Sequence, residues 1–285
     1  MNTRKVVEQL RARPASDGAG VKLLRVFSGP GPERFDPFLM LDEFGSEEAS
    51  DYIAGFPPHP HRGFETITYM LQGKMEHRDH MGNVGLLNDG DVQWMTAGKG
   101  VIHSEMPKQT EGKMRGFQLW LNLPSHSKMQ PAHYADIAAD NIPEYELQGL
   151  RIKAIAGALD VDGEAIKGYF DVPDTEALYL DLHLDPGREL SVALPEQQNV
   201  LVYVYEGEVV IGADATPARA QTISRLDRGE RVQLANKASD KQARVLLLAG
   251  TPLKEPIVQY GPFVMNTTAE IEQAMSDYRA GTLTD

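Results

Sequence analysis

The chain has 285 residues, of which 41% are hydrophobic and 24% charged, and its formal net charge at pH 7 is −13. A single hydrophobic core rarely serves a chain of this length, so we expect two globular domains. Because cysteine is absent, disulfides, thiolate zinc sites and thiol nucleophiles are excluded, and any metal must be held by nitrogen and oxygen ligands.

The charge balance and the N-terminal sequence limit the expected partners and location. Neutralising phosphates takes clustered Lys and Arg residues, and the sequence has no such run, so we expect no direct nucleic-acid binding. The opening sequence MNTRKVVEQLRARPASDG lacks the apolar segment of a secretory signal, and no stretch is apolar enough to span a membrane. We therefore expect a cytoplasmic protein without membrane contacts.

Short apolar runs between Gly, Pro, Asn and Asp residues dominate the chain and predict strands rather than helices. In chain order, the expected strands cover residues 21–27, 38–41, 66–71, 84–87, 117–123, 152–155, 178–184, 200–205 and 245–248. Short strands at this spacing are typical of sandwiches and barrels, so we predict an all-β fold.

Two stretches depart from this pattern. Residues 124–143, which contain three prolines, are expected to connect the two halves and to hold a helical turn around 132–139. Near the end of the sequence, Thr267 or Thr268 can cap a helix that Gly281 terminates, so we predict one short C-terminal helix.

The tripeptides HPH at 59–61 and HSE at 103–105 each place two metal-ligand side chains at positions i and i+2. In an extended strand these positions share a face, so two neighbouring strands can direct three imidazoles and one carboxylate to one point. Pro60 cannot donate a ladder hydrogen bond, which predicts an edge position for its strand. One such tripeptide is more often incidental than functional, but two within one predicted barrel favour a metal site.

The donor set limits the metal without fixing it. Three imidazoles and one carboxylate suit Fe(II), Mn(II), Co(II), Ni(II) or Cu(II), and they leave about two positions open at a six-coordinate ion. The site is therefore expected to admit a further ligand. The candidate metal ligands are His59, His61, His103 and Glu105.

The two halves of the chain resemble one another weakly. Aligning the turn glycines Gly73 and Gly207 brings LNDGDVQ (87–93) near LDRGERVQ (226–233), with five extra residues in the second half. Each half then consists of a strand, a glycine turn, a strand, a second turn and another strand.

Under this alignment the second half lacks the ligands. Ala193 takes the position of His59, and Pro195 takes the position of His61. The asymmetry predicts one metal, in the N-terminal half.

Longer strings resemble the pirin family of the cupin superfamily. They are PFLMLDEFG (37–45), FPPHPHRGFETITYMLQGKMEHRDHMGN (56–83), GDVQWMTAGKGVIHSEMP (90–107), GFQLWLNLP (116–124) and QYGPFVMNT (259–267). The resemblance covers nearly the whole chain and implies a bicupin, with two tandem β-barrel (jelly-roll) domains and a short C-terminal helix. We place a metal-binding cupin domain at 1–130 and a degenerate cupin domain without metal ligands at 131–285.

The resemblance also implies a cofactor and two functions. It favours one Fe(II) at His59, His61, His103 and Glu105, with Mn, Co, Ni, Cu and Zn as alternatives. The first function is a flavonol (quercetin) 2,3-dioxygenase, for which a small aromatic enol or flavonol and O2 are the partners and Glu105 is the catalytic base. The second is a non-enzymatic, iron-dependent redox sensor or transcriptional co-regulator that binds a protein partner. A purely structural metal is a third reading, but closed sites without cysteine are unusual.

Other residues near the ligands have two interpretations each. Glu65 shares strand parity with His59 and His61 and either faces their cavity or is solvated. Arg62 either meets a substrate anion or pairs with a local carboxylate. The large apolar residues either line an aromatic pocket or fill the core; they are Phe56, Phe64, Trp94, Met95 and Met106. The remaining histidines, at 77, 80, 126, 133 and 183, are expected to be exposed or hydrogen-bonded structural residues.

Overall fold

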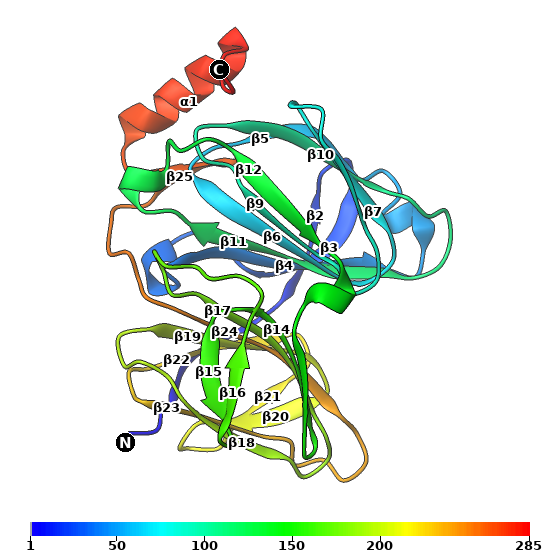
Figure 1. Cartoon of the computed structure of the whole chain (residues 1–285), viewed down its shortest axis with the longest axis vertical. Coiled ribbons are helices and arrows are strands. Elements are labelled where there is room, and N and C mark those ends of the chain that lie inside the picture. The colour runs from blue at the N-terminus through cyan, green and yellow to red at the C-terminus, as the bar shows by residue number, and fades with distance from the viewer. Residues whose placement is uncertain (1) are drawn as a thin grey trace. The chain divides into compact units, whose positions relative to one another are not determined.

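The computed structural model describes residues 2–285 and shows a chain built mainly of antiparallel strands (Figure 1). It forms two compact units, and each unit combines segments that are distant in the sequence. The histidine unit contains Arg13–Arg34, Phe38–Ala139 and Leu253–Asp285, and the second unit contains the N-terminal residues up to Ala12, Phe35–Pro37 and Asp140–Pro252. The contiguous domains 1–130 and 131–285 stay a prediction, whereas the observed units exchange their terminal segments.

The histidine unit has a large sheet and a small sheet. The large sheet runs in the order β12 (His133–Ile137), β9 (Val92–Thr96), β6 (Phe64–Gln72), β11 (Met114–Asn122), β4 (Phe38–Ser46), β3 (Val21–Phe27) and β2 (Arg13–Asp17). The small sheet runs β5 (Phe56–His61), β10 (Val101–Pro107), β7 (Met75–Asp79) and β8 (Val84–Leu87). The C-terminal segment adds the hairpin β25 (Val258–Tyr260) and β26 (Phe263–Met265), followed by α1 (Thr268–Ala280).

The second unit repeats this arrangement. Its large sheet runs β1 (Val6–Arg11), β22 (Thr222–Leu226), β19 (Asn199–Glu206), β24 (Ala243–Gly250), β17 (Leu178–Leu184), β14 (Leu150–Ala156) and β13 (Glu144–Leu147). Its small sheet runs β18 (Glu189–Ala193), β23 (Arg231–Ala235), β20 (Glu208–Ile211) and β21 (Thr216–Arg219), and β15 (Ala158–Val161) pairs with β16 (Glu164–Lys167). The order of strands is the same in both units, with β1 in the place that β12 has in the histidine unit.

This topology corrects the alignment of the two halves. Strand β9 corresponds to β22 and β10 corresponds to β23, because each pair has the same neighbours in its sheets. The segment 226–233 leads into β23 and therefore matches the approach to β10, not the segment 87–93 that precedes β9. The expected repeat exists, but the predicted match of segment 87–93 with segment 226–233 is wrong by one strand.

Aliphatic side chains fill the interior of the second unit where the histidine unit carries its candidate ligands. On the corresponding strands, Val192 and Val232 pair directly and belong to the buried core. Ala193 is exposed, and Pro195 follows the end of β18. The predicted correspondence of Ala193 with His59 is therefore wrong, because one step along a strand reverses the face to which a side chain points.

The prediction for the connection at 124–143 is partly wrong, whereas that for the C-terminal helix is right. Residues 133–137 form strand β12, so the helical turn expected around 132–139 is wrong; single 3₁₀ turns lie at Ser125–Ser127 and Ala139–Asn141 instead. Helix α1 begins with a capping box between Thr267 and Glu270 and ends at Gly281, whose φ is +74°. The helix and both of its ends are confirmed.

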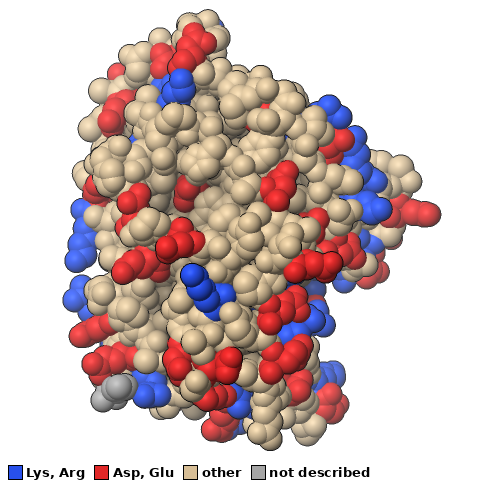
Figure 2. Space-filling model, viewed as in Figure 1, with Lys and Arg blue, Asp and Glu red and all other residues tan. Residues whose placement is uncertain are grey.

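The surface carries charged side chains of both signs. Acidic side chains are spread among the basic ones over the face of the molecule in Figure 2. Among residues 2–285, no helix is long and apolar enough to cross a membrane.

The buried residue Lys128 joins three segments around the turn between β5 and β6. Its Nζ donates to the carbonyls of Gly63 (2.7 Å) and Val264 (3.1 Å) and to Asn122 Oδ1 (2.7 Å). Gly63 has a φ of +90°, and a Cβ at this position would lie 2.0 Å from the Val264 carbonyl oxygen, so the turn requires glycine. The turn that follows His61 is thereby fixed to the C-terminal segment.

Lys128→Met is expected to lower the free energy of unfolding by about 3 kcal/mol, because it leaves three buried acceptors without their charged donor. Urea unfolding followed by circular dichroism measures the change. Lys113→Met is the matched control, since the Lys113 side chain is 39% exposed and its Nζ lies 3.9 Å from Glu47. A change within about 0.5 kcal/mol is expected there. Equal effects of the two substitutions would show that the buried ammonium group does not stabilise the turn.

Candidate functional site

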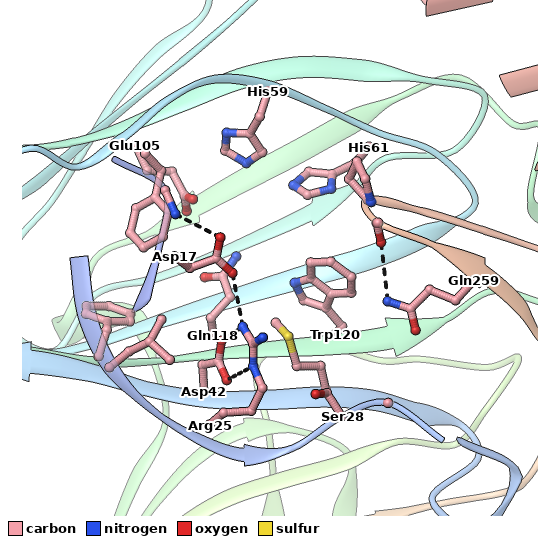
Figure 3. A pocket seen from close by; sticks show the side chains of 18 of the residues that line it. Asp17, Arg25, Ser28, Asp42, His59, His61, Glu105, Gln118, Trp120 and Gln259 are labelled. Carbon is pink, nitrogen blue, oxygen red and sulfur yellow. Dashed lines mark hydrogen bonds and ion pairs between the residues drawn. The ribbon is translucent and has the colours of Figure 1, made fainter. Parts of the chain in front are cut away.

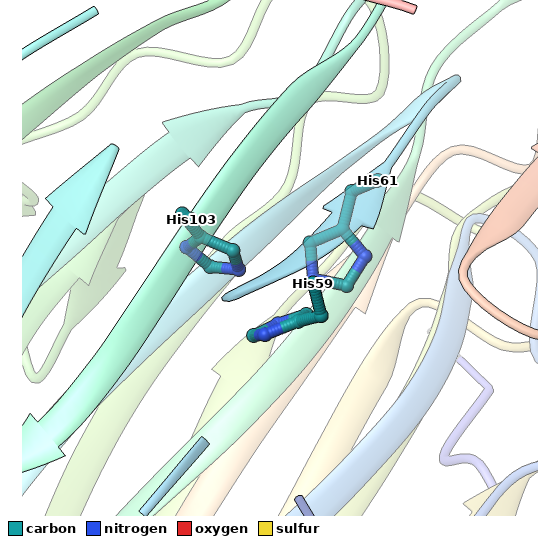
Figure 4. A group of neighbouring side chains, drawn as sticks. All are labelled: His59, His61 and His103. Atoms are coloured by element: carbon teal, nitrogen blue, oxygen red, sulfur yellow. The ribbon is translucent and has the colours of Figure 1, made fainter. Parts of the chain in front are cut away.

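The pairing of β5 with β10 brings three histidines together. His59 lies directly opposite His103, and His61 lies opposite Val101. Because residues two apart on a strand share a face, the three rings turn toward one point (Figure 4). Their ligand nitrogens lie within 4.8 Å of one another, and among residues 2–285 this is the one group with such geometry. Strand β5 is at the edge of its sheet, as Pro60 predicted.

Hydrogen bonds orient two of the three rings, and the bond of His59 also fixes its tautomer. His59 Nδ1 lies 2.8 Å from the carbonyl oxygen of Pro57, so it donates its proton there and keeps a lone pair on Nε2. His103 Nδ1 lies 2.6 Å from His77 Nε2, and the buried Nε2 of His103 has no partner among the described residues. Metal-binding histidines are typically oriented in this way through their second nitrogen. The cluster therefore fits a metal ion.

Burial keeps the central imidazoles neutral. It lowers the pKa of His61 well below the usual value, and the neighbouring His59 lowers it further, although a hydrogen bond with the backbone of Pro262 opposes the effect. Burial holds the pKa of His103 well below its usual range, and the neighbouring imidazoles of His61, His59 and His77 lower it further. A metal binds the unprotonated ring, so the site is prepared for a cation at neutral pH.

Glu105 lies in the same cavity but not in the converging group. It is buried on β10, two residues after His103, and the register of β10 against β5 shifts between these two residues. Such an irregularity redirects the side chain that follows it. Glu105 Oε1 lies 3.3 Å from Thr68 Oγ1, and the side chain lines the cavity beside His59 and His61 (Figure 3). Its role as a fourth ligand stays a prediction.

His59 and His61 line a cavity of about 1060 Å³ between the two sheets of the histidine unit. Most of its wall is apolar, and Trp120 packs edge-on against His61 with ring centroids 5.5 Å apart. Of the large apolar residues that the sequence proposed as lining, Phe56 lines the cavity, whereas Phe64 and Met95 belong to core clusters. A volume of this size admits a ligand of several fused rings.

The hydrogen bond from a candidate ligand to His77 was not expected from the sequence. The prediction of a hydrogen-bonded structural histidine is confirmed, but its partner is His103. His77 is buried on β7 and packs edge-on against Tyr134, with ring centroids 5.1 Å apart. The sequence could not reveal this partner, because the contact exists only if β7 pairs with β10 on the side opposite β5.

Glu65 and Arg62, which are near the candidate ligands in the sequence, do not line the cavity. Glu65 is buried, accepts a hydrogen bond of 2.6 Å from Thr96, and does not line the cavity, so both of its expected positions are wrong. The turn at Gly63 separates β5 from β6, so strand parity does not carry over from His61. Arg62 pairs with Asp277, 2.7 Å away, which confirms the local-carboxylate interpretation.

The C-terminal segment forms part of the site. Arg62 also donates to the carbonyl oxygens of Lys99 and Leu283, and its backbone carbonyl accepts from Val264 N (3.0 Å). In the same segment, residues 257, 259, 261 and 262 line the cavity. Residues that are some 200 positions apart in the sequence therefore build one wall.

Comparisons with known proteins agree with this fold and site. A family model described as Pirin matches residues 20–121, and one described as Pirin C-terminal cupin domain matches 179–284. A Pseudomonas aeruginosa protein named "putative quercetin 2,3-dioxygenase" is 54% identical over 98% of both chains, and human pirin is 40% identical over 98% of this chain and 93% of its own. These matches confirm the expected bicupin.

Solved structures give the same result. A crystal structure described as quercetin 2,3-dioxygenase from Acinetobacter baumannii has a TM-score of 0.89 and 35% identity over 98% of both chains. A bacterial pirin from Escherichia coli, solved in complex with nickel(II), shares the fold with a TM-score of 0.63 and 22% identity, over 88% of this chain and 98% of its own. The three-histidine cluster fits a metal-binding cupin.

Metal-free protein is expected to lose stability as the pH falls below about 6.5, the ordinary pKa of histidine. The pKa values of His61 and His103 are lower in the folded state, so the unfolded chain binds their protons first and acid favours unfolding. The loss is expected to reach up to about 1.4 kcal/mol per pH unit for each histidine. Urea unfolding between pH 7.5 and 5 measures it.

The double substitution His61→Asn, His103→Asn is expected to flatten this dependence, whereas His126→Asn, at an exposed position, leaves it unchanged. An equally steep loss in the double variant would assign the pH dependence to other groups.

Proposed function

Because the chain belongs to the pirin family, we propose that it is a metal-dependent flavonol 2,3-dioxygenase, which uses O2 to cleave the heterocycle and releases carbon monoxide. The observation that carries this proposal is the three-histidine cluster at the wall of an apolar cavity large enough for a flavonol. The names of relatives with high sequence identity support it.

We propose Fe(II) as the resident metal, with Mn, Co, Ni, Cu and Zn as alternatives that the same donors accept. His59, His61 and His103 would hold it, with Glu105 as the fourth ligand. When bound, the ion supplies a Lewis acid that lowers the pKa of an enol hydroxyl and keeps the enol and O2 side by side.

Glu105 is the proposed base for the enol proton. Thr68 has a single hydroxyl proton, and its Oγ1 lies 2.6 Å from Gln118 Oε1 but 3.3 Å from Glu105 Oε1, so the bond to Gln118 is favoured. The Glu105 carboxylate therefore keeps lone pairs for a substrate proton within hydrogen-bond reach.

The wall beside the histidines suits a flat aromatic substrate. Trp120 packs against His61 and against Phe64, with ring centroids 5.5 and 4.3 Å apart, so its position is fixed from two sides. An apolar wall next to the ligands excludes water and offers a face on which an aromatic ring can stack.

Protein loaded anaerobically with Fe(II) is expected to consume O2 when quercetin is added. Glu105→Gln removes the base and is expected to lower the rate at least about 100-fold. His103→Ala is expected to lose the metal, which elemental analysis measures. His126→Ala, at an exposed position in the turn Ser125–Ser127, is the control and should retain both metal and turnover.

The outcome that would refute the proposal is the absence of O2 uptake with a panel of flavonols in protein that contains stoichiometric metal. Loss of O2 uptake in His126→Ala would show instead that the assay reports general damage to the fold.

A further inference from the structure

A row of polar side chains crosses the inner face of the large sheet in the histidine unit. Thr68 on β6 lies opposite Gln118 on β11, Gln118 lies opposite Asp42 on β4, and Asp42 lies opposite Arg25 on β3. We call these four residues the polar row. Strands in a sheet are about 4.8 Å apart, so the row extends over roughly 14 Å.

The polar row runs from the candidate metal site to the other side of the cavity. At one end, Thr68 lies within hydrogen-bond distance of Glu105. At the other end, Arg25 and Asp42 line the cavity, and Figure 3 shows them on the side of Trp120 away from the histidines. Polar groups on an otherwise apolar wall fix the orientation of a ligand.

Arg25 keeps hydrogen-bond donors for a ligand although it is already paired. Its Nε and Nη2 donate to Asp42 at 3.0 and 2.8 Å, and Nη2 also donates to Asp17 at 3.0 Å. Its Nη1 makes no hydrogen bond to the residues that the structure describes. The Arg25 side chain is 29% exposed at the cavity, whereas Asp42 is 4% exposed beneath it.

The charges of this group limit what it can bind. The guanidinium of Arg25 is flanked by two carboxylates, Asp42 and Asp17, so the group has a net charge of about −1 and does not attract an anion. A neutral hydroxyl suits this group, because it can accept a hydrogen bond from Arg25 Nη1 and donate one to the Asp17 carboxylate. Gln118 accepts from Thr68 through Oε1, which leaves its amide group as a further donor along the row.

We propose that the polar row is a recognition subsite for an aromatic enol that carries a phenolic hydroxyl at the end remote from the enol. This inference rests on the proposed function, because the enol is placed at the histidines and Glu105. With the enol there, the rings lie against Trp120 and Met40, and the remote hydroxyl reaches Arg25. Hydrogen bonds to charged groups are the stronger ones, so hydroxylated flavonols are selected over bare ones.

The test compares the binding of quercetin with that of 3-hydroxyflavone, which has the same enol but no remote hydroxyl. Dissociation constants are measured by calorimetry without O2, in metal-loaded protein, so that no turnover is needed. Quercetin is expected to bind about 10-fold more tightly. Arg25→Lys retains a cation beside Asp42 but loses the Nη1 donors, and it is expected to bring the ratio close to one.

Two further variants complete the experiment. The double substitution Arg25→Met, Asp42→Leu removes both partners of the pair and covers the case in which Arg25→Lys misfolds. Arg115→Lys is the matched control, because Arg115 pairs with Glu43 on the same sheet outside the cavity lining. Comparing this ratio of dissociation constants between variants cancels the difference in hydration between the two ligands, because that difference is the same for every variant.

The outcomes separate this inference from the proposed function. A ratio near one in the unmodified protein, or an unchanged ratio in both Arg25 variants, would overturn the subsite. A ratio that falls in the Arg25 variants and not in Arg115→Lys supports it, even if neither ligand is turned over. In that case the proposed dioxygenase reaction fails and the subsite stands.

Discussion

The antiparallel register of β5 against β10 decides where every candidate ligand points. His59 meets His103 across the pair, and His61 follows on the same face. A slip of β5 by one residue would turn His59 and His61 to the opposite face of the sheet, away from His103. The register is held from both sides, since β10 also pairs with β7, whose His77 bonds to His103. The site therefore depends on strand pairing before it depends on any metal.

The cavity combines two kinds of polar chemistry on separate walls. On the small sheet, burial keeps imidazoles neutral and their lone pairs available for a cation. On the large sheet, Arg25 and Asp42 remain charged because each satisfies the other, and the pairing raises the pKa of Arg25. Burial raises the pKa of Asp42, and its bonds to Arg25 oppose that effect. Thr68 and Gln118 lie between the two groups, since Thr68 Oγ1 is 3.3 Å from Glu105 Oε1 and Gln118 lies opposite Asp42.

Sequence reasoning succeeded where a local rule decides the structure. The HPH and HSE tripeptides predicted a shared face because strands have a period of two, and Thr267 and Gly281 predicted the helix ends from their capping chemistry. The prediction failed where parity had to be carried across a turn, as for Glu65, and where glycine positions were used to align distant strands.

Long-range pairing explains what the sequence did not reveal. Arg25 and Asp42 meet only because β3 and β4 pair in one register, and Gln118 joins them through β11. The available signal was the few polar residues within or beside each apolar run, and they do not identify their partners. The same limit applies to β12, whose residues form a strand because β9 offers an edge.

The exchange of terminal segments has a consequence for how the protein matures in the cell. The histidine unit contains Leu253–Asp285, and Arg62, next to a candidate ligand, bonds to Asp277 and Leu283. During synthesis, these partners leave the ribosome only after the entire second unit has been translated. The wall behind the histidines is therefore completed only after residues 277–283 have been synthesised.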